Sequence, residues 1–479
     1  MNSIRKNFLY NVAYQILLIL LPLITTPYIS RVLGADRIGI YTYTYTVVNY
    51  FVLVAMLGVK NYGNRSIASV RDDPNQLSQT FWEIYSLQFL CSALALGGYF
   101  FFVFTFEAEN LFIFVIQSIY IFSGMTDISW LFFGLEQFKV TVLRNIAMKL
   151  LTLACIFLFV RSPGDLWIYT LILSIGTFSS QSYLWLYLRR HVKWQRPRFS
   201  RIFSHLRPEL ILFIPVIAVS LYKMMDKIML KELATYTQVG YYESAEKILN
   251  IPTGIITALG TVMLPRMSHL AAKSKVDESK RYIYNSMLFA VFLAAGMMFG
   301  IAGIAEDFVP LFLGDDYTAC ISLLQALCPT VLFISWANVI RTQYLIPNHH
   351  DRSYIISVLL GALVNLVLNA LLIPRMAAMG AVIGTVCAEA AVCISQTFMV
   401  RRELEISRYL KATLPFPLLG FGMFVLILLV RICFSSPAVT VVIQVVIGIC
   451  FYTAASAVYL AFSNRELFRR FLRKFGKKK

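Results

Sequence analysis

Long apolar stretches alternate with short polar links along most of the chain. About fourteen of these stretches are long enough to cross a bilayer as α-helices, which takes roughly 17 to 25 residues. Their approximate bounds are 8 to 31, 38 to 60, 81 to 105, 110 to 133, 141 to 161, 165 to 189, 208 to 231, 239 to 266, 282 to 304, 320 to 343, 353 to 373, 379 to 402, 411 to 433 and 437 to 463. The pattern predicts an all-α, polytopic membrane protein with about fourteen transmembrane helices.

Basic residues are distributed unevenly between the links. The even-numbered links and both ends of the chain are rich in Lys and Arg, whereas the odd-numbered links hold only Arg37, Arg161, Lys231, Arg375 and Arg431. Loops rich in Lys and Arg stay preferentially on the cytoplasmic side of a membrane. We therefore expect both termini in the cytoplasm, which requires an even number of crossings.

Two short motifs recur in the second half of the chain. Gly39-Ile40-Tyr41 opens the second span as Gly240-Tyr241-Tyr242 opens the eighth, and Leu131-Phe132-Phe133-Gly134 is matched by Tyr344-Leu345-Ile346-Pro347. Similar halves in the same orientation are typical of parallel repeats, which place a substrate site between two lobes near the membrane midplane. We predict two pseudo-symmetric six-helix lobes, residues 1–207 and 208–402, followed by two additional helices and a basic cytoplasmic tail in residues 403–479.

Composition excludes several other classes of protein. With 58% hydrophobic and 14% charged residues, the chain is far more apolar than a soluble globular protein, in which about a quarter of the residues are charged. The net charge of +18 lies in the expected cytoplasmic links and tail, so we expect contact with anionic membrane lipids and no nucleic-acid partner. The eight cysteines form no Cys-x-x-Cys pair, and we predict neither disulfides nor a metal site.

Several basic residues fall inside the predicted spans, where a charge at the bilayer centre costs about 2.5 to 3.5 kcal/mol on insertion scales. Such residues usually face a bundle interior or a wet cavity. They therefore indicate a cationic cavity with an anionic cargo. These residues are Arg31, Arg144, Lys149, Lys223, Lys227, Lys247 and Arg341.

The depth of each charge changes its interpretation. Arg31 and Arg341 lie near span ends, where long side chains can reach the headgroups, and Arg144 is close to the cytoplasmic edge. Lys149 lies more than a turn deeper, which favours a place in the cavity.

Charge pairing within one helix offers a structural alternative for the other basic residues. Lys223, Asp226 and Lys227 share one helical face, so Asp226 can neutralise one of the two lysines and one positive charge is left. Glu243 and Lys247 are spaced as a self-contained i, i+4 pair.

Acidic residues inside the spans are candidates either for charge partners or for carriers of a coupling ion, Na⁺ or H⁺. Glu246 needs a partner other than Lys247. Asp127 is expected to pair with Arg144 or Lys149, or else to carry a proton, and Glu389 near the middle of the twelfth span stays open between these roles. Aromatic residues such as Tyr41 should mostly form packing and interfacial belts, with a few polar rings facing the cavity where they would suit sugars.

A combination of motifs resembles bacterial polysaccharide-type flippases of lipid-linked oligosaccharides, which belong to the same superfamily as multidrug extruders and lipid II flippases. The motifs are Pro27-Tyr28-Ile29-Ser30-Arg31-Val32-Leu33-Gly34, the stretch from Asp127 to Lys139, Asp226-Lys227, Gly240-Tyr241-Tyr242 and Ala245-Glu246-Lys247. The resemblance covers nearly the whole chain. It implies a central cationic cavity between two lobes, with Lys60 as an additional candidate for substrate binding.

The resemblance also implies the activity and its setting. By alternating access, an undecaprenyl-diphosphate oligosaccharide would move from the inner to the outer leaflet of the bacterial cytoplasmic membrane. No resident cofactor is expected. A glycan polymerase and glycosyltransferases of the same pathway are the expected protein partners.

Two other functions compete with this one. A cation-coupled multidrug exporter of the same superfamily would hold an acidic cavity for cationic drugs, whereas the excess charge here is basic. A membrane glycosyltransferase or polymerase would need a catalytic cluster or a sizeable outer loop. The longest outer link runs only from about Ala305 to Ala319, and all five histidines fall in cytoplasmic links. We therefore predict no catalytic residues and no enzyme.

Overall fold

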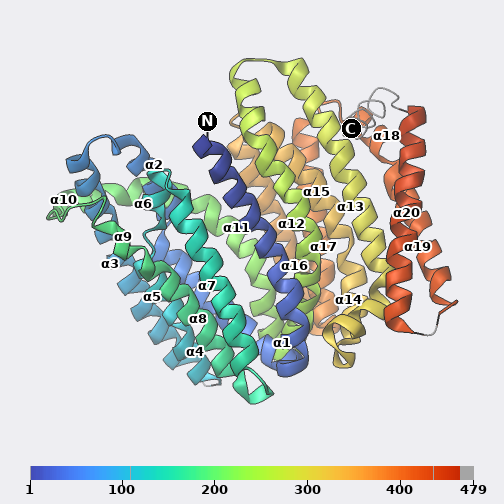
Figure 1. Ribbon diagram of the computed structural model, residues 1–479, viewed down its shortest axis with the longest axis horizontal. Coiled ribbons are helices and arrows are strands. Elements are labelled where there is room, and N and C mark those ends of the chain that lie inside the picture. Colours follow the sequence, from blue (N-terminus) through green and yellow to red (C-terminus); the bar gives the residue numbers. More distant parts are fainter. Residues whose placement is uncertain (1, 108, 435, 464–479) are drawn as a thin grey trace. The chain divides into compact units, whose positions relative to one another are not determined.

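Every regular element of the described chain is a helix. The computed structural model describes residues 2–107, 109–434 and 436–463, and Figure 1 shows the succession of helices. The chain divides into two compact units, Met1–Gly240 and Tyr241–Lys479. The lobe boundaries at 207 and 402 describe a sequence repeat rather than these units, and they stay predictions.

The first unit contains the helices up to the start of α12. They are α1 (Asn2–Met56), α2 (Val59–Val70), α3 (Pro74–Phe106), α4 (Leu111–Gln117), α5 (Ile119–Thr126), α6 (Ser129–Gly134), α7 (Phe138–Phe159), η1 (Pro163–Asp165), α8 (Leu166–Tyr183), α9 (Trp185–Leu188), α10 (Phe199–Ile202), η2 (Phe203–His205), α11 (Leu206–Leu233) and the first turn of α12 (Tyr236–Ala272).

The second unit contains the rest of α12 and the helices that follow. They are α13 (Val276–Leu313), η3 (Asp315–Tyr317), α14 (Ala319–Leu327), α15 (Pro329–Ile340), the π-helical turn η4 (Arg341–Leu345), α16 (Asp351–Met376), α17 (Ala378–Val400), α18 (Ile406–Thr413), α19 (Pro415–Arg431) and α20 (Pro437–Ser463).

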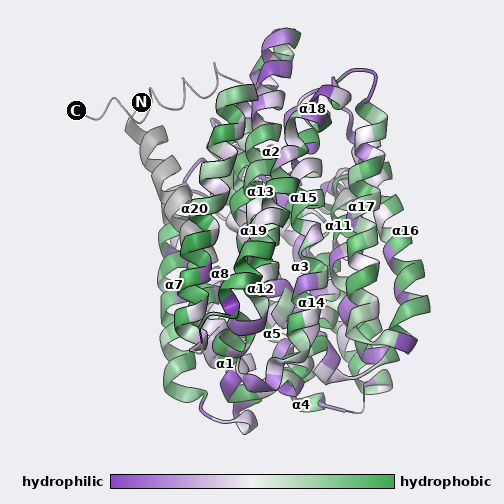
Figure 2. Cartoon of the chain, turned by 90° about the vertical axis from the view of Figure 1, so that its right-hand side faces the viewer, coloured by the Kyte–Doolittle hydropathy of each residue, from purple (hydrophilic) through white to green (hydrophobic). Residues whose placement is uncertain are grey.

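The predicted spans all fall in helical segments, the first two largely within α1, which confirms the all-α membrane fold. Within the described residues, eleven helical stretches are long and apolar enough to cross a membrane on length and composition alone. These stretches cover every predicted span except the two that correspond to α8 and α11. One of the stretches contains both of the first two predicted spans, because it includes α1 and α2. The predicted count of fourteen spans is therefore approximate. Figure 2 shows hydrophobic residues along the helices and hydrophilic residues gathered toward their ends and connections.

Two left-handed turns redirect the chain at the start of the first unit. Gly34 (φ 77°) interrupts α1 between the first two predicted spans. Leu57 (φ 40°) and Gly58 (φ 82°) then turn the chain between α1 and α2. Positive φ values suit glycine, because it has no Cβ to clash with the following backbone. The second turn matters for function, since it sets the direction in which α2 begins.

A close crossing of α2 and α6 forms the core of one end of the first unit. An ideal Cβ on Gly63 would lie 2.6 Å from the ring of Trp130, and one on Gly134 would lie 2.6 Å from Ile67. Trp130 and Ile67 are fully buried in the same apolar cluster, together with Phe81. Small residues allow membrane helices to approach closely and gain van der Waals contact. This crossing fixes the short helix α6 against α2.

The two C-terminal helices pack against α13 in the second unit. An ideal Cβ on Gly420 of α19 would lie 2.6 Å from the ring of Phe299, and the Tyr452 hydroxyl of α20 donates a hydrogen bond of 2.7 Å to the Phe292 carbonyl. Arg431 at the end of α19 forms ion pairs with Glu306 and Asp307 of α13. The additional helices are thus an integral part of this unit, whereas the tail from Arg465 to Lys479 lies outside the described residues.

The two glycines of the repeated motif meet each other in the first unit. An ideal Cβ on Gly39 would lie only 1.7 Å from the Tyr236 carbonyl oxygen, and one on Gly240 only 1.9 Å from the Ala35 carbonyl oxygen. Because the colliding atoms belong to the backbone, neither helix can relieve such a clash by moving a side chain. The contact between α1 and the first turn of α12 therefore requires glycine at both positions.

We predict that Gly39→Ala lowers the thermal stability of the purified protein, because overpacking costs typically about 1 to 3 kcal/mol. Gly97→Ala is the matched control, since Gly97 lies in α3 with no atom within 4 Å of its ideal Cβ. That change should leave stability unchanged or raise it slightly. Equal melting temperatures for Gly39→Ala and Gly97→Ala would contradict the backbone contact.

Candidate functional site

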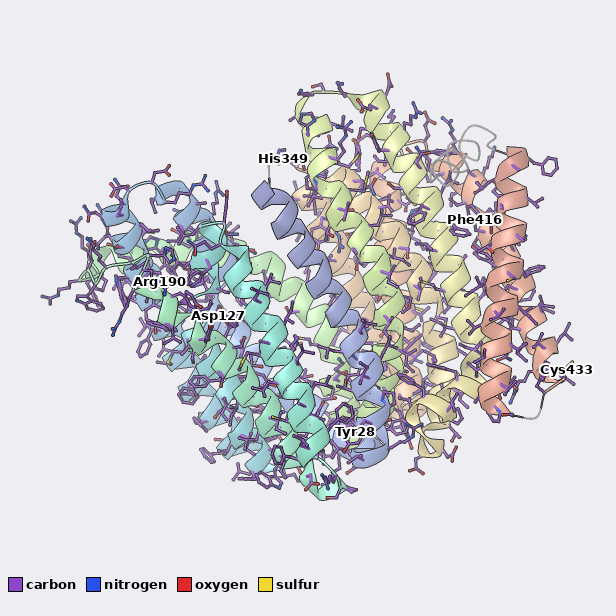
Figure 3. The ribbon with its side chains drawn as sticks, in the orientation of Figure 1. Tyr28, Asp127, Arg190, His349, Phe416 and Cys433 are labelled. Atoms are coloured by element: carbon purple, nitrogen blue, oxygen red, sulfur yellow. The ribbon has the colours of Figure 1, made fainter. Side chains whose placement is uncertain are left out.

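A cavity of about 660 Å³ lies within the first unit, bounded by α1, α2, α6, α7 and α8. Its lining includes three basic residues, Lys60, Arg144 and Lys149, and one acidic residue, Asp127. Three of the eight predicted substrate-binding residues thus line one cavity. In Figure 3, Tyr28 and Arg190 lie toward opposite ends of the first unit, with Asp127 between them.

Asp127 sits at a break in the fourth predicted span. Helix α5 ends at Thr126, Asp127 is extended (φ −75°, ψ 98°), and α6 begins at Ser129. The Asp127 carboxylate accepts a hydrogen bond of 2.9 Å from the Ser129 backbone N–H. A carboxylate in this position satisfies a donor that the helix start would otherwise leave open.

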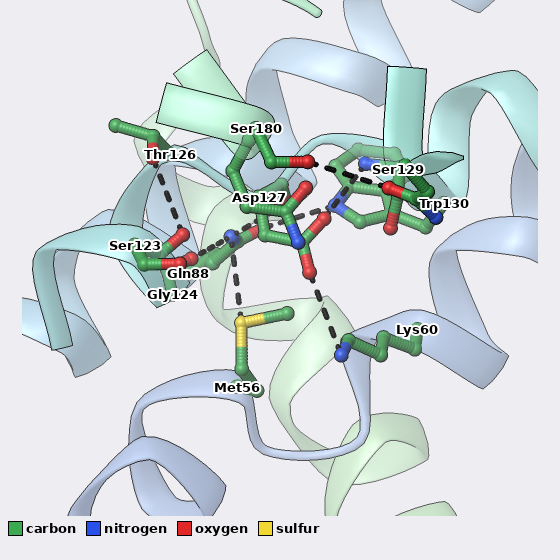
Figure 4. Close-up of polar contacts among 12 residues, drawn as sticks. Met56, Lys60, Gln88, Ser123, Gly124, Thr126, Asp127, Ser129, Trp130 and Ser180 are labelled. Atoms are coloured by element: carbon green, nitrogen blue, oxygen red, sulfur yellow. Dashed lines mark hydrogen bonds and ion pairs between the residues drawn. The ribbon is translucent and has the colours of Figure 1, made fainter. Parts of the chain in front are cut away.

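Gln88 of α3 connects the two sides of this break (Figure 4). Its side-chain amide donates to the carbonyl oxygens of Gly124 (2.7 Å) and Asp127 (3.0 Å), and its oxygen accepts from the Trp130 indole (3.0 Å). Gln88 is buried. Backbone groups inside a membrane protein need such partners, because no bulk water can replace the lost helical bonds.

Lys60 is the ion-pair partner of Asp127. Its ammonium nitrogen lies 3.5 Å from a carboxylate oxygen, and the exposed fraction is 64% for the Lys60 side chain and 4% for that of Asp127. The expectation that Asp127 pairs with Arg144 or Lys149 was therefore wrong. The physical reason is the turn at Leu57 and Gly58, which places the first turn of α2 next to the break.

Arg144 is buried beside the cavity and hydrogen-bonds to neutral amides. Its guanidinium donates to the Asn145 side-chain oxygen at 2.7 Å and to the Gln181 side-chain oxygen at 3.3 Å. Ser180 also donates to Asn145, at 3.3 Å. These amide oxygens hold the guanidinium in place beside the cavity. Arg144 can therefore attract an anion in the cavity.

Lys149 lines the cavity on α7, close to one and a half turns beyond Arg144. The Lys149 side chain is exposed, and in the described part of the chain its ammonium has no carboxylate oxygen within 4 Å. Two of the three cations, Arg144 and Lys149, thus come from one helix.

The other predicted residues of the first unit do not line this cavity. Arg31 is exposed and donates to the Pro27 carbonyl at 3.4 Å. On α11, Lys223 is exposed, Lys227 is half-buried and Asp226 is buried. The pairing of Asp226 with Lys223 or with Lys227 stays a prediction.

The remaining candidates belong to the second unit. Lys247 and Glu243 form the predicted i, i+4 ion pair at 3.2 Å. Arg341 donates to the Asn338 side-chain oxygen at 2.8 Å, and its guanidinium lies 5.8 Å from the centre of the Tyr354 ring. Glu246 and Glu389 are half-buried. Their roles in substrate binding or ion coupling stay predictions.

Sequence analysis missed the neutral polar part of the cavity lining. Thr177, Ser180 and Gln181 of α8 are spaced i, i+3 and i+4, which places them on one face of the helix toward the cavity. This polar face within an apolar stretch is a signal that the sequence itself contains. Tyr169 also lines the cavity.

Tyr169 continues into a cluster of tyrosines behind the cavity wall. Its ring packs edge-on against the ring of Tyr41, with 4.9 Å between the ring centres. The ring of Tyr41 stacks on that of Tyr45, with 5.7 Å between the centres. The hydroxyls of Tyr41 and Tyr120 lie 3.3 Å apart. All four tyrosines are only partly buried, so the cluster presents both ring faces and hydroxyls.

A second polar cluster of the first unit lies apart from the cavity lining, where α3 and α11 end. The Tyr43 hydroxyl lies 2.5 Å from a Glu107 carboxyl oxygen and 2.9 Å from one of Glu232, either of which can accept its single proton, and Lys231 pairs with Glu232 at 3.0 Å. Burial raises the pKa of the Glu107 carboxyl. This network ties α1 to both helix ends and reads as a structural junction.

Comparison with known proteins identifies the family. The model of the polysaccharide biosynthesis protein family matches residues 4–271. The chain belongs to this family. That result confirms the resemblance seen in the motifs of the sequence.

Individual relatives in this family comparison are distant. A candidate O-antigen transporter of Shigella dysenteriae is 24% identical over 379 residues, which are 78% of this chain and 94% of the relative. A candidate low-salt glycan biosynthesis flippase of Haloferax volcanii, Agl15, is 25% identical over 167 residues, 34% of each chain. The names are those of transporters and flippases, which agrees with the prediction that the chain is not an enzyme.

Solved structures share the fold. The lipid II flippase MurJ in an inward closed conformation has a TM-score of 0.74 at 14% identity, over 96% of this chain and 99% of that chain. An inward-facing multidrug transporter of the MATE family has a TM-score of 0.63 at 14% identity, over 85% and 96%. These similarities show that the chain shares the fold of these two proteins, and they carry no information on the cargo.

We predict that Asp127→Ala destabilises the protein more than Asp127→Asn. Both changes remove the ion pair with Lys60, which contributes at most about 1 kcal/mol because Lys60 is exposed. Only alanine also removes the acceptor for the Ser129 N–H, at a cost of about 0.5 to 2 kcal/mol. Thermal unfolding of the purified variants tests this order, and equal melting temperatures would show that Asp127 does not cap α6.

Proposed function

We propose that this protein is a flippase that moves an undecaprenyl-diphosphate-linked oligosaccharide from the inner to the outer leaflet of a bacterial cytoplasmic membrane. One observation carries the proposal: Lys60, Arg144 and Lys149 line a single cavity whose one acidic residue, Asp127, is already paired. A diphosphate is the anion that such a site suits, because ammonium and guanidinium groups donate charge-assisted hydrogen bonds to phosphate oxygens. The names of the relatives support the same cargo class.

The geometry suggests how the cations would share the diphosphate. Arg144 is held in place by amide oxygens, whereas the side chain of Lys60 is exposed and can turn from Asp127 toward a ligand. The diphosphate would then replace Asp127 as the partner of Lys60. Binding and release of the cargo would thus require the exchange of one weak ion pair.

The cavity volume limits which parts of the lipid-linked oligosaccharide can enter. A volume of about 660 Å³ is in the range of small-molecule sites, so it can accept the diphosphate and the first sugars but not a long polyprenyl chain. The lipid tail would stay in the bilayer. The neutral polar residues of α8 and the ring of Tyr169 are suited to sugar hydroxyls and apolar sugar faces.

A multidrug exporter is the alternative within the same fold, but the charges of the cavity disfavour it. A cavity for cationic drugs would carry unpaired acids, and here three bases accompany one paired acid. The coupling ion, Na⁺ or H⁺, and the glycan polymerase and glycosyltransferase partners of the pathway stay part of the proposal.

We predict that Lys149→Ala strongly reduces transport while the protein remains inserted at its native level, because the change removes a ligand of the diphosphate rather than a structural partner. Lys149→Glu should be worse, since repulsion is added to the loss. Surface glycan in cells and flipping of a fluorescent polyprenyl-diphosphate oligosaccharide in proteoliposomes are the two readouts.

Lys273→Ala is the matched control for this experiment. Lys273 is an exposed lysine outside the cavity lining, and its removal should leave both readouts unchanged. Normal flipping by Lys149→Ala at native abundance would remove Lys149 from the substrate site. Reduced flipping by Lys273→Ala as well would point to a general loss of positive charge.

The direction of transport depends on the topology, for which we predict cytoplasmic termini. Cysteine introduced at Asp315 should react with an impermeant external reagent, and cysteine introduced at Arg198 should not, because only the second position lies in a basic link. Both residues are exposed. The background should lack the exposed Cys387, Cys433 and Cys450, and the reverse labelling pattern would invert the proposed topology.

A further inference from the structure

A long apolar groove lies in the second unit, far along the chain from the cavity residues. Its volume is about 750 Å³, and almost all of the atoms that line it are apolar. Ile394 and Phe398 of α17 form one wall, and Leu410 and Leu414 on α18 and its junction with α19 form another. These side chains are exposed, by 65% for Ile394 and 61% for Leu414. The apolar lining of the groove is thus suited to a hydrocarbon chain.

A second pocket, of about 870 Å³ and with charged residues in its lining, adjoins the groove. Its lining contains Ser407, Lys411 and the ion pair of Glu405 with Arg408, and the two hollows share Arg401, Ile406 and Lys411. The shared residues come from the end of α17 and from α18. One continuous site therefore passes from charged to apolar lining.

The cations at this junction differ in their acidic partners within the described residues. Arg408 is paired with Glu405 at 2.9 Å. In the part of the chain that the structure describes, neither Arg401 nor Lys411 has a carboxylate oxygen within 4 Å, and the Arg401 guanidinium lies 3.7 Å from the centre of the Phe398 ring. The ring holds the guanidinium at the mouth of the groove by a cation–π contact.

The short helix α18 indicates that the junction of the two hollows lies at a membrane surface. Ile406, Tyr409 and Thr413 are buried on one side of it, whereas Arg408 and Lys411 are exposed on the other. An amphipathic helix of this kind lies between apolar and polar surroundings, with its cations at the level of the lipid headgroups. This arrangement favours headgroup depth for the second pocket and chain depth for the groove.

We propose that this is a binding site for an anionic phospholipid, with the phosphate on Arg401 and Lys411 and an acyl chain along the groove. Charge complementarity selects the headgroup, and the apolar lining selects a lipid over a free phosphate. Each basic residue near the surface strengthens the attraction to anionic lipid. The site is independent of the glycan cavity, so it holds whether or not the cargo proposal is correct.

Native mass spectrometry of the full-length protein in detergent tests this site, with phosphatidylglycerol as the probe and phosphatidylcholine as the comparison lipid. Wild type should retain phosphatidylglycerol in preference to phosphatidylcholine. The double variant Arg401→Gln with Lys411→Gln should weaken the phosphatidylglycerol affinity by about tenfold or more, since two basic contacts are lost. Arg402→Gln is the matched control, because Arg402 is exposed in the same link and lines neither hollow.

Four outcomes would overturn the proposal. These are equal retention of the two lipids, a loss in Arg402→Gln equal to that in the double variant, displacement of phosphatidylglycerol by inorganic phosphate, and displacement by a polyprenyl diphosphate that itself depends on Arg401 and Lys411. The last result would assign the site to the transported lipid. Retention of phosphatidylglycerol by wild type and by Arg402→Gln, together with its loss in the double variant, would support the resident lipid.

Discussion

The cavity of the first unit depends on the two contacts that the carboxylate of Asp127 makes. The carboxylate caps the start of α6 through the Ser129 N–H and pairs with Lys60 across the cavity wall. A break in a membrane span is tolerated only where the freed backbone groups find partners, and Gln88 supplies them on the other side. The same break turns α6 onto α2, where Trp130 packs against Gly63. Capping, packing and cavity charge therefore depend on one residue position.

The balance of charges gives this arrangement a functional sense. Three bases and one acid line the cavity, and the acid is buried while its partner is exposed. Because Lys60 reaches solvent, an anion that offers it several oxygens can compete with the single carboxylate of Asp127. Asp127 then keeps its cap on α6 while Lys60 changes partners. A buried pair, in contrast, would be costly to separate.

The sequence predicted the helices, the membrane class and two of the three cavity cations, because apolar length and the cost of buried charge can be read residue by residue. Arg144 and Lys149 were found in this way. Lys60 was implied only by family resemblance and was placed near the membrane rim, because the predicted second span continued straight to it. The left-handed turn at Leu57 and Gly58 and the break at Asp127 change that direction, and neither has a signal in hydropathy.

Other features depend on three-dimensional contacts that no local pattern contains. The choice of Asp127 between Lys60 and the bases of α7 depends on which helix faces the break. Asn145 and Gln181, whose amides hold Arg144, can be recognised in the sequence as polar residues in apolar spans. Their contact with Arg144 cannot be recognised there. The glycines of the repeat show the opposite case, since Gly39 and Gly240 were recognised by sequence and meet directly in the fold.

The central claim is that a diphosphate displaces Asp127 from Lys60, and the affinity of the purified protein for a polyprenyl diphosphate tests it most directly. Asp127→Asn should bind the diphosphate several-fold more tightly than wild type, because Lys60 no longer has a competing carboxylate, and this gain should disappear when Lys60→Gln is added. Weaker binding by Asp127→Asn, or the same gain in the Lys60→Gln background, would contradict the account.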